Sequence, residues 1–532
     1  MIKALFKMQM AETFSWLFMD KKAGKKRTQE KTFLYILLYL IIFGFLCVTF
    51  YNIAKKLGVA LFAADLGWLY FSIMSLLGVL LGVFGSVFNT YSTLYLARDN
   101  DLLLSLPVEP AKILAVRLSG IYAMGLLYEL IVMIPAVAVY FIYQNSGILS
   151  IIFCILIPFV LSVFILTLSC VLGWVVALII KKTKNKSIIT VIISLIFLFG
   201  YFYFYNKGYA MLESIAANPE MISVNTNGAM YPLYRLGLAA QGNALSMLIF
   251  TAIIAVLFLA VYAALSKSFT RLAGDAFSAS KSKKQAKILK VQSADRALLS
   301  KEMHRFLGSS IYMLNCGLGI VLMLVGAVGI IIKADYLNEM IWGMFEEHED
   351  FVPLLLFGII CMMSTMNSIT APSVSLEGKN IWIAQSLPVS TYKILRAKVR
   401  LHLILTLIPV LILTACVEAV LKPDILSAVL ILIGAVVFVI FSALAGLSLN
   451  LRFPNLKWTN ETIPVKQSIS VLLALFGGWA VIGIIEIIYL AFAYIYIPSP
   501  AYLAIAELIL AIISLALYKF IKTKGCIIFK GL

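Results

Sequence analysis

Long apolar runs, separated by short polar and basic segments, fill the chain from residue 33 almost to its end. Each run is about 20 residues or longer, which is enough for a helix to cross the hydrocarbon core of a bilayer. The runs are continuous and do not alternate with a period of two, so they predict helices and not the strands of a membrane barrel. The predicted spans cover residues 33–53, 67–97, 113–142, 148–180, 187–205, 246–265, 311–333, 351–371, 394–420, 425–448, 468–495 and 500–520.

Composition supports this pattern. The chain has 532 residues, of which 62% are hydrophobic and 13% are charged. Soluble domains carry about 25% charged residues, roughly twice that share. The predicted fold class is therefore an all-α polytopic membrane protein with about 12 transmembrane helices, surrounded by the lipid bilayer.

The distribution of Lys and Arg predicts how the spans are oriented. If the N-terminus lies in the cytoplasm, 37 of the 43 Lys and Arg residues fall in cytoplasmic segments. Under the positive-inside rule, this bias predicts a multi-pass protein of the cell (plasma) membrane with both termini in the cytoplasm. The net charge of +18 then lies mostly on the face that meets anionic lipid, and it requires no nucleic-acid partner.

One short sequence occurs twice. SLPVEPAKIL begins at Ser105 and SLPVSTYKIL begins at Ser386, and seven of their ten positions are identical at an offset of 281. One copy joins spans 2 and 3, and the other joins spans 8 and 9. Because six spans separate them, the sequence predicts two parallel six-helix repeats. The predicted parts are a first half with an N-terminal interfacial helix (1–265), a basic cytoplasmic linker (266–296) and a second half (297–532).

Each copy of this sequence predicts a short amphipathic helix, a break and a new span. Pro107 and Pro388 supply the breaks, because the residue before a proline is biased to extended geometry. Apolar side chains would lie at the membrane surface among charged neighbours. Such a helix could lie flat on lipid or dock into a soluble partner, and the acidic neighbours favour docking over contact with acidic lipid.

The segments RDNDLLLSLPVEPAKILAVRL and SLEGKNIWIAQSLPVSTYKILRAKVRL resemble the cytoplasmic loop of ABC-2-type exporter permeases. HRFLGSSIYMLN and FPNLKWTNETIPVKQS also resemble the fused, double-length ABC exporter permeases of Gram-positive bacteria. In such permeases this loop is the coupling helix, so the resemblance implies a partner, an ABC ATPase subunit present in two copies. The implied contact residues are Asp99, Asp101, Leu102, Leu103, Leu104, Glu377, Asn380, Ile381, Trp382 and Ile383.

One feature departs from that family. Its members often have a re-entrant extracellular segment between spans 5 and 6, for which the first half has room at residues 206–243. The second half has only residues 496–500 there, so any outer gate is asymmetric or lies within spans 11 and 12.

The sequence lacks motifs for chemistry of its own. It contains no GxxxxGK[ST] phosphate loop, no HExxH or GxSxG motif and no paired Cys/His spacing for a metal. We therefore predict a transport subunit that is not an enzyme and binds no cofactor. ATP and Mg would be held by the partner ATPase.

Carboxylates inside the predicted spans leave another function open. Glu129, Glu486 and Glu507 lie within spans, where ionisable groups usually face a bundle interior or an aqueous cavity. They could contact substrate or relay protons, or they could simply pair helices. An ion-coupled secondary transporter therefore stays an alternative to the ABC exporter, as does a membrane scaffold that transports nothing. The sequence does not indicate the substrate.

Overall fold

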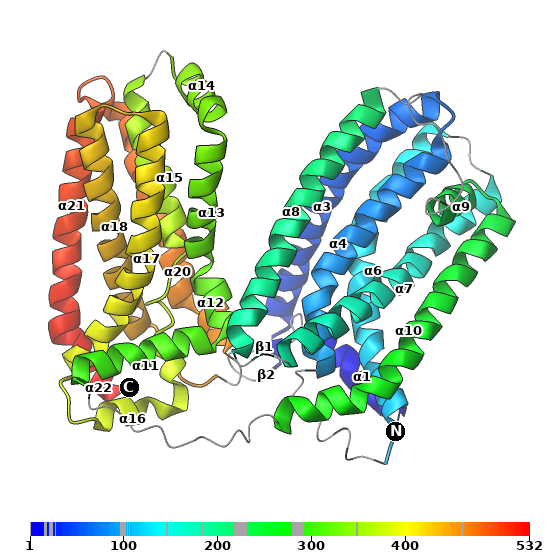
Figure 1. Cartoon of the computed structure of the whole chain (residues 1–532), viewed down its shortest axis with the longest axis horizontal. Helices are drawn as coiled ribbons and strands as arrows, with labels where there is room; N and C mark the ends of the chain where they lie inside the picture. The colour runs from blue at the N-terminus through cyan, green and yellow to red at the C-terminus, as the bar shows by residue number, and fades with distance from the viewer. Residues whose placement is uncertain are drawn as a thin grey trace. The chain divides into compact units, whose positions relative to one another are not determined.

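The computed structural model describes most of the chain as helices in two compact units, Met1–Lys287 and Ile288–Leu532 (Figure 1). The residues outside the description are 1, 15–18, 21–24, 27, 96–102, 104, 106, 145–146, 182, 184, 218–230, 279–291, 347–348 and 459–460.

The first unit contains a short N-terminal helix, six long helices and one short helix before the last of these. In chain order they are α1 (Ile2–Thr13), α3 (Gln29–Ala63), α4 (Gly67–Tyr95), α6 (Pro110–Tyr143), α7 (Ile148–Lys181), α8 (Lys186–Ala217), α9 (Tyr231–Ala240) and α10 (Ala244–Ser278). A two-residue antiparallel pair, β1 (Met19–Asp20) and β2 (Lys25–Lys26), follows α1.

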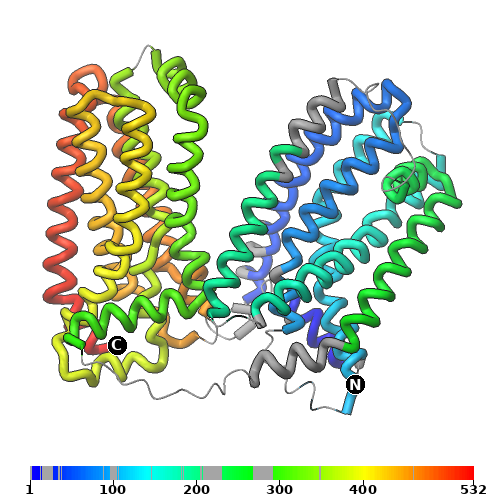
Figure 2. Tube along the Cα trace, in the orientation of Figure 1, coloured from blue at the N-terminus to red at the C-terminus, as the bar shows by residue number. Residues whose placement is uncertain are grey.

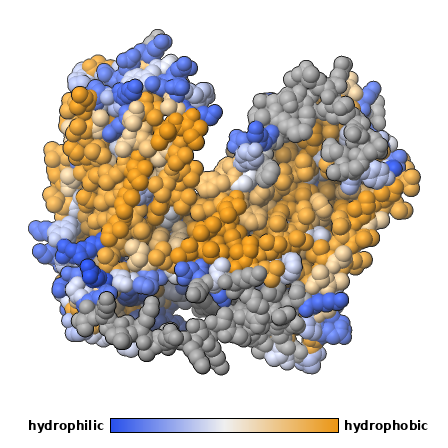
Figure 3. Space-filling view, viewed as in Figure 1, coloured by the Kyte–Doolittle hydropathy of each residue, from blue (hydrophilic) through white to orange (hydrophobic). Residues whose placement is uncertain are grey.

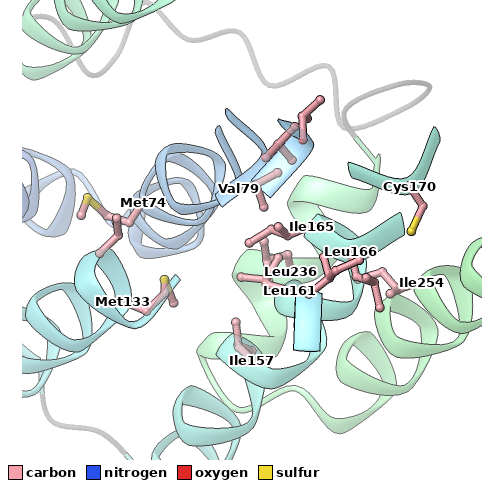
Figure 4. Packing of buried hydrophobic residues seen from close by; sticks show 14 of the residues in the cluster. Met74, Val79, Met133, Ile157, Leu161, Ile165, Leu166, Cys170, Leu236 and Ile254 are labelled. Carbon is pink, nitrogen blue, oxygen red and sulfur yellow. The ribbon is translucent and has the colours of Figure 1, made fainter. Parts of the chain in front are cut away.

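Helix α4 forms the centre of the first unit and packs against α6, α7 and α9. Met74 and Val79 of α4 are buried together with Met133 of α6 and Ile165 of α7 (Figure 4). A helix that is hydrophobic on all sides can be buried in this way within a larger bundle.

The second unit also begins with a short helix, and several of its long helices are interrupted or flanked by short ones. Its helices are α11 (Ala294–Gly308), α12 (Ser310–Cys316), α13 (Leu318–Ile332), α14 (Ala334–Met344), η4 (Glu349–Phe351), α15 (Val352–Thr365), η5 (Ser375–Asn380), α16 (Ile381–Ser386), α17 (Thr391–Leu421), α18 (Ile425–Arg452), α19 (Thr462–Lys466), α20 (Ile469–Ile488), η6 (Tyr489–Ala493), α21 (Ser499–Phe520), η7 (Ile521–Gly525) and α22 (Cys526–Gly531). Helix α18 packs against both α17 and α21 (Figure 2).

The helices confirm the predicted fold class. Ten of them are long and apolar enough to span a membrane, and two bent helix pairs could raise the number of spans to twelve. Helices α12 and α13 form one pair, bent by 54° at Gly317, where an added Cβ would lie 2.7 Å from the Phe306 ring. In the unit with α13 to α21, the surface between the two ends is apolar and hydrophilic side chains gather at both ends (Figure 3).

Two boundaries differ from the predicted ones. Helix α10 continues to Ser278, so the segment predicted as a linker from residue 266 begins inside a helix. The eighth predicted span, 351–371, is α-helical only to Thr365. The next residues form turns that are almost fully buried, and irregular backbone at membrane depth is tolerated only where protein or water covers it.

Candidate functional site: the anchored loop before α17

The second copy of the repeated sequence begins at Ser386, the last residue of α16, and runs into the first turns of α17. It follows a loop that connects α15 to α17. The 3-10 helix η5 leads into α16, and Pro388 separates α16 from α17. Gly378 makes the turn between η5 and α16 with φ of 56° and ψ of −139°, a positive-φ conformation that glycine adopts without steric cost. A Cβ at Gly378 would also lie 3.2 Å from the Trp458 ring, so close packing reinforces the requirement for glycine.

Glu377 of η5 is the centre of a buried ionic network. Its side chain is only 3% exposed and lies among three cations. Lys301 Nζ lies 3.0 Å from Oε1, Lys398 Nζ lies 2.9 Å from the same oxygen, and Arg305 Nη2 lies 2.6 Å from Oε2. The loop is thereby joined to α11 through Lys301 and Arg305, and to the spanning helix α17 through Lys398.

Lys398 is the most buried member of the network, with a side chain that is 0% exposed. Its ammonium donates three hydrogen bonds, to Glu302 Oε1, Glu377 Oε1 and the Ser373 carbonyl, at 2.9 to 3.0 Å. Three donors therefore have three acceptors, which is the condition under which a buried charge can be tolerated.

The charges stabilise one another. Burial alone would raise the pKa of Glu377, but the positive charges of Lys398, Arg305 and Lys301 outweigh burial and hold this pKa well below its usual value. Counting Glu302, two carboxylates face three cations, so the network carries one positive charge when every member is ionised. Glu377 therefore holds the loop as an ionised carboxylate at neutral pH.

A second set of contacts fixes the residues just before Glu377. Asn450 of α18 accepts hydrogen bonds from the backbone N–H groups of Val374 and Ser375, at 2.7 and 3.0 Å. Its amide donates to the Ser375 and Ser470 hydroxyls. Trp458 Nε1 donates to the Ser375 carbonyl at 2.7 Å. The loop is therefore tied to α18 and to the FPNLKW segment as well as to α11 and α17.

The predicted contact residues of this loop divide by exposure. Trp382 and Ile383 are 61% and 47% exposed, and Asn380 is exposed as well. Ile381 is buried, and so is Glu377. Glu377 therefore lies where it holds the loop in place, and the surface available to a partner consists of Asn380 and the outward side of α16. This end of the unit also carries α11 and α22 (Figure 1).

In the first unit, Asp99, Asp101, Leu102 and Leu104 lie outside the described residues, and Leu103 is buried in the core. One feature does match the second unit. Arg117 of α6 lies at the offset of 281 from Lys398, is 1% exposed, and donates from Nη1 to Gln9 Oε1 of α1 at 3.1 Å.

Thus each unit binds the first span after the repeated sequence to a preceding short helix through a buried cation. Arg117, Lys398 and Trp458 lie within the segments that carry the family resemblance, but no role was predicted for them. Glu302 and Asn450 were not singled out from the sequence at all.

The comparison with protein-family models gives one match, to a family described as a membrane protein of 12 TMs, over residues 31–522. The chain belongs to this twelve-span membrane protein family. No curated protein and no solved structure matched the chain. Within the family's region lie both copies of the repeated sequence and every residue of the ionic network around Glu377.

Glu129, Glu486 and Glu507, the three carboxylates singled out within the spans of this twelve-span protein, each pack against a glycine of a neighbouring helix. Glu129 is 0% exposed, and its oxygen would lie 2.5 Å from a Cβ at Gly78 of α4. Glu507 lies equally close to Gly434 of α18, and Glu486 occupies the space beside Gly358 of α15. Neither oxygen of Glu129 has a hydrogen-bond partner among the described residues.

The three carboxylates are divided between the two units. Glu129 belongs to the first unit, and Glu486 and Glu507 belong to the second. In the described part of the chain, no group of three or more His, Cys, Asp or Glu residues could hold a metal ion.

Proposed function

We propose that this chain is the permease subunit of an ABC exporter, energised by two copies of a separate ATPase that bind ATP and Mg. The observation that carries the proposal is the loop before α17. Trp382 and Ile383 present a large apolar surface among polar neighbours, on a loop that ionic and hydrogen bonds join to three helices. Exposed aromatic residues of this kind are typical anchors of protein interfaces.

The anchoring supports a mechanical role. Because Glu377 binds Lys398 of α17 and both cations of α11, a partner that displaces α16 must also displace these helices or break a buried ionic network. Breaking such a network by removing one partner costs about 3 kcal/mol or more. In the proposed mechanism, ATP-driven closure of the ATPase subunits moves the loops of both halves and rocks one half against the other.

The proposed orientation follows from charge. The end of the second unit with α11, α16 and α22 would face the cytoplasm, together with both termini of the chain. Lys and Arg gather in the segments at this end, as the positive-inside rule requires of cytoplasmic segments.

Co-purification tests the proposed partner. Trp382→Glu should reduce the amount of ATPase that purifies with the chain by about tenfold or more, because it places a charge in the centre of an apolar contact. The matched control is Tyr496→Glu, at an aromatic residue that is 83% exposed in the connection between η6 and α21, at the other end of the unit. Equal loss of ATPase in both variants, or loss in neither, would count against the proposed contact.

The buried carboxylates favour a second candidate, an ion-coupled secondary transporter. Glu129 has the burial expected of a group that relays protons or binds an ion, and it lacks a polar partner among the described residues. Transport into proteoliposomes that contain an ion gradient and no ATPase would select this candidate. Loss of this transport in Glu129→Gln would show that the Glu129 carboxyl couples the ion to transport. If instead a strain that lacks the gene distributes its substrates as the wild type does, a scaffold that transports nothing would be favoured.

A further inference from the structure

A cavity of about 420 Å³ lies in the second unit, between the helices α18, α20 and α21. Its volume lies within the usual range of small-molecule sites, which is about 300–1,000 Å³. Most of its lining is apolar, and it includes Phe441, Leu449, Val481, Leu517 and Phe520. Leu473 and Ile513 also line it and are 44% and 41% exposed, so the cavity opens on the apolar belt of the unit.

Small residues on α18 and α20 leave the space that forms the cavity. Gly477 of α20 lines the cavity, and a Cβ added there would meet nothing within 4 Å. Ala474 lies one helical turn away, and Ala445 and Gly446 line the cavity from α18. A larger side chain at Gly477 would therefore extend into the cavity.

The end of the cavity nearest α11 and α16 is polar and positive. Arg452, the last residue of α18, lines it and is exposed. No described carboxylate forms an ion pair with Arg452. Ser448 lies one turn earlier on α18 and lines the same cavity, and its hydroxyl has no hydrogen-bond partner among the described residues.

An apolar cavity that opens on lipid and ends in an arginine matches one class of ligand, an amphiphile with an acyl chain and an anionic head. Arginine binds phosphate with a planar fork of donors, and basic pockets between spanning helices bind anionic lipid head groups. We infer that this cavity binds an anionic phospholipid, with its phosphate at Arg452 and one acyl chain between α18, α20 and α21. The inference does not depend on the proposed transport function.

Native mass spectrometry of the purified full-length chain tests this site. The probes are phosphatidylglycerol, phosphatidylcholine with the same chains, diacylglycerol, which has no head group, and glycerol phosphate, which has no chains. We expect phosphatidylglycerol to be retained at least tenfold better than the other three. Equal retention of diacylglycerol would show a purely apolar cavity, equal binding of glycerol phosphate would show a small-anion site, and equal retention of phosphatidylcholine would show no charge selectivity. Each of these results would overturn the inference.

Two variants, each with a matched control, locate the lipid. Gly477→Leu should fill the cavity and abolish retention of phosphatidylglycerol, whereas Gly483→Leu, also on α20 with open space around its Cβ, should not. Arg452→Gln should lower retention about tenfold, whereas Lys457→Gln, an exposed residue at the same end, should leave it unchanged. Wild-type retention in Gly477→Leu and Arg452→Gln would contradict the assignment. A thermal melt of each variant separates lost binding from lost folding.

Discussion

Single residues decide how the loop before α17 is held. Burying Lys398 is unfavourable unless every donor finds an acceptor, and here Glu302, Glu377 and the Ser373 carbonyl provide all three. The three cations in turn stabilise the ionised form of Glu377. An ionic network of this kind gives the loop one defined position, because any other position would leave buried charges without partners.

Glu377→Gln should therefore destabilise the protein by about 3 kcal/mol at pH 7, since it leaves Lys398 and Arg305 with one charged partner fewer. The measurement is thermal unfolding in detergent. Lys379→Gln, an exposed residue of η5, is the control and should change little. If Glu377→Gln loses no more stability than this control, the network does not hold the loop in place.

The same carboxylate predicts a pH dependence. Its pKa is lower in the folded protein than the ordinary value of 4.5, so its contribution is fully present above pH 4.5. Below that pH the unfolded chain takes up the proton first, and the contribution is lost progressively. The difference in melting temperature between wild type and Glu377→Gln should therefore shrink as the pH falls from 5 to 3. A difference that stays constant over this range would contradict the ionised network.

Asn450 stabilises the loop through hydrogen bonds from a neutral side chain. Asn450→Leu should cost about 2 kcal/mol or more, because the backbone N–H groups of Val374 and Ser375 would stay buried without an acceptor. Ser448→Ala on the same helix is the control, since the Ser448 hydroxyl has no partner among the described residues. Hydrogen exchange at Val374 and Ser375 should rise in Asn450→Leu only, and protection equal to wild type would argue against this contact.

At the scale of elements, close helix contacts depend on glycines that leave room for carboxyl groups. Gly78→Ala should destabilise the first unit by about 2 kcal/mol, because the new methyl would lie 2.5 Å from a Glu129 oxygen. In a Glu129→Ala background, Gly78→Ala should reduce the stability of the unit much less. The control is Gly44→Ala, which has open space around it and should reduce stability little in either background. Additive losses in the double variant would show that the two residues do not compete for space.

The apolar pattern predicted the spans well, because helices in a bilayer must satisfy their backbone hydrogen bonds within themselves. It failed after Thr365, where side chains from distant segments, such as Asn450, satisfy the backbone and no continuous helix is needed. The family resemblance implied a partner contact for Glu377, because the sequence does not show that three cations from α11 and α17 surround this residue. Arg117 and Lys398 are 281 residues apart, like the two copies of the repeated sequence. This equal spacing could have identified Lys398 as a partner of the loop.

For the whole molecule, the account depends on two equivalent loops that face one side of the membrane. Each unit has a short helix before its first span and a buried cation after its copy of the repeated sequence. Both features are consistent with a duplicated six-span half within the twelve-span family. The proposed ATPase adds the requirement that these loops contact a soluble protein while the permease works.

A photocrosslinking amino acid at position 382, introduced into the full-length chain in living cells, tests this requirement most directly. We predict a crosslink to a soluble protein with a phosphate-binding loop, stronger than any formed from the same probe at position 496. Crosslinks from position 382 to lipid alone would contradict the account.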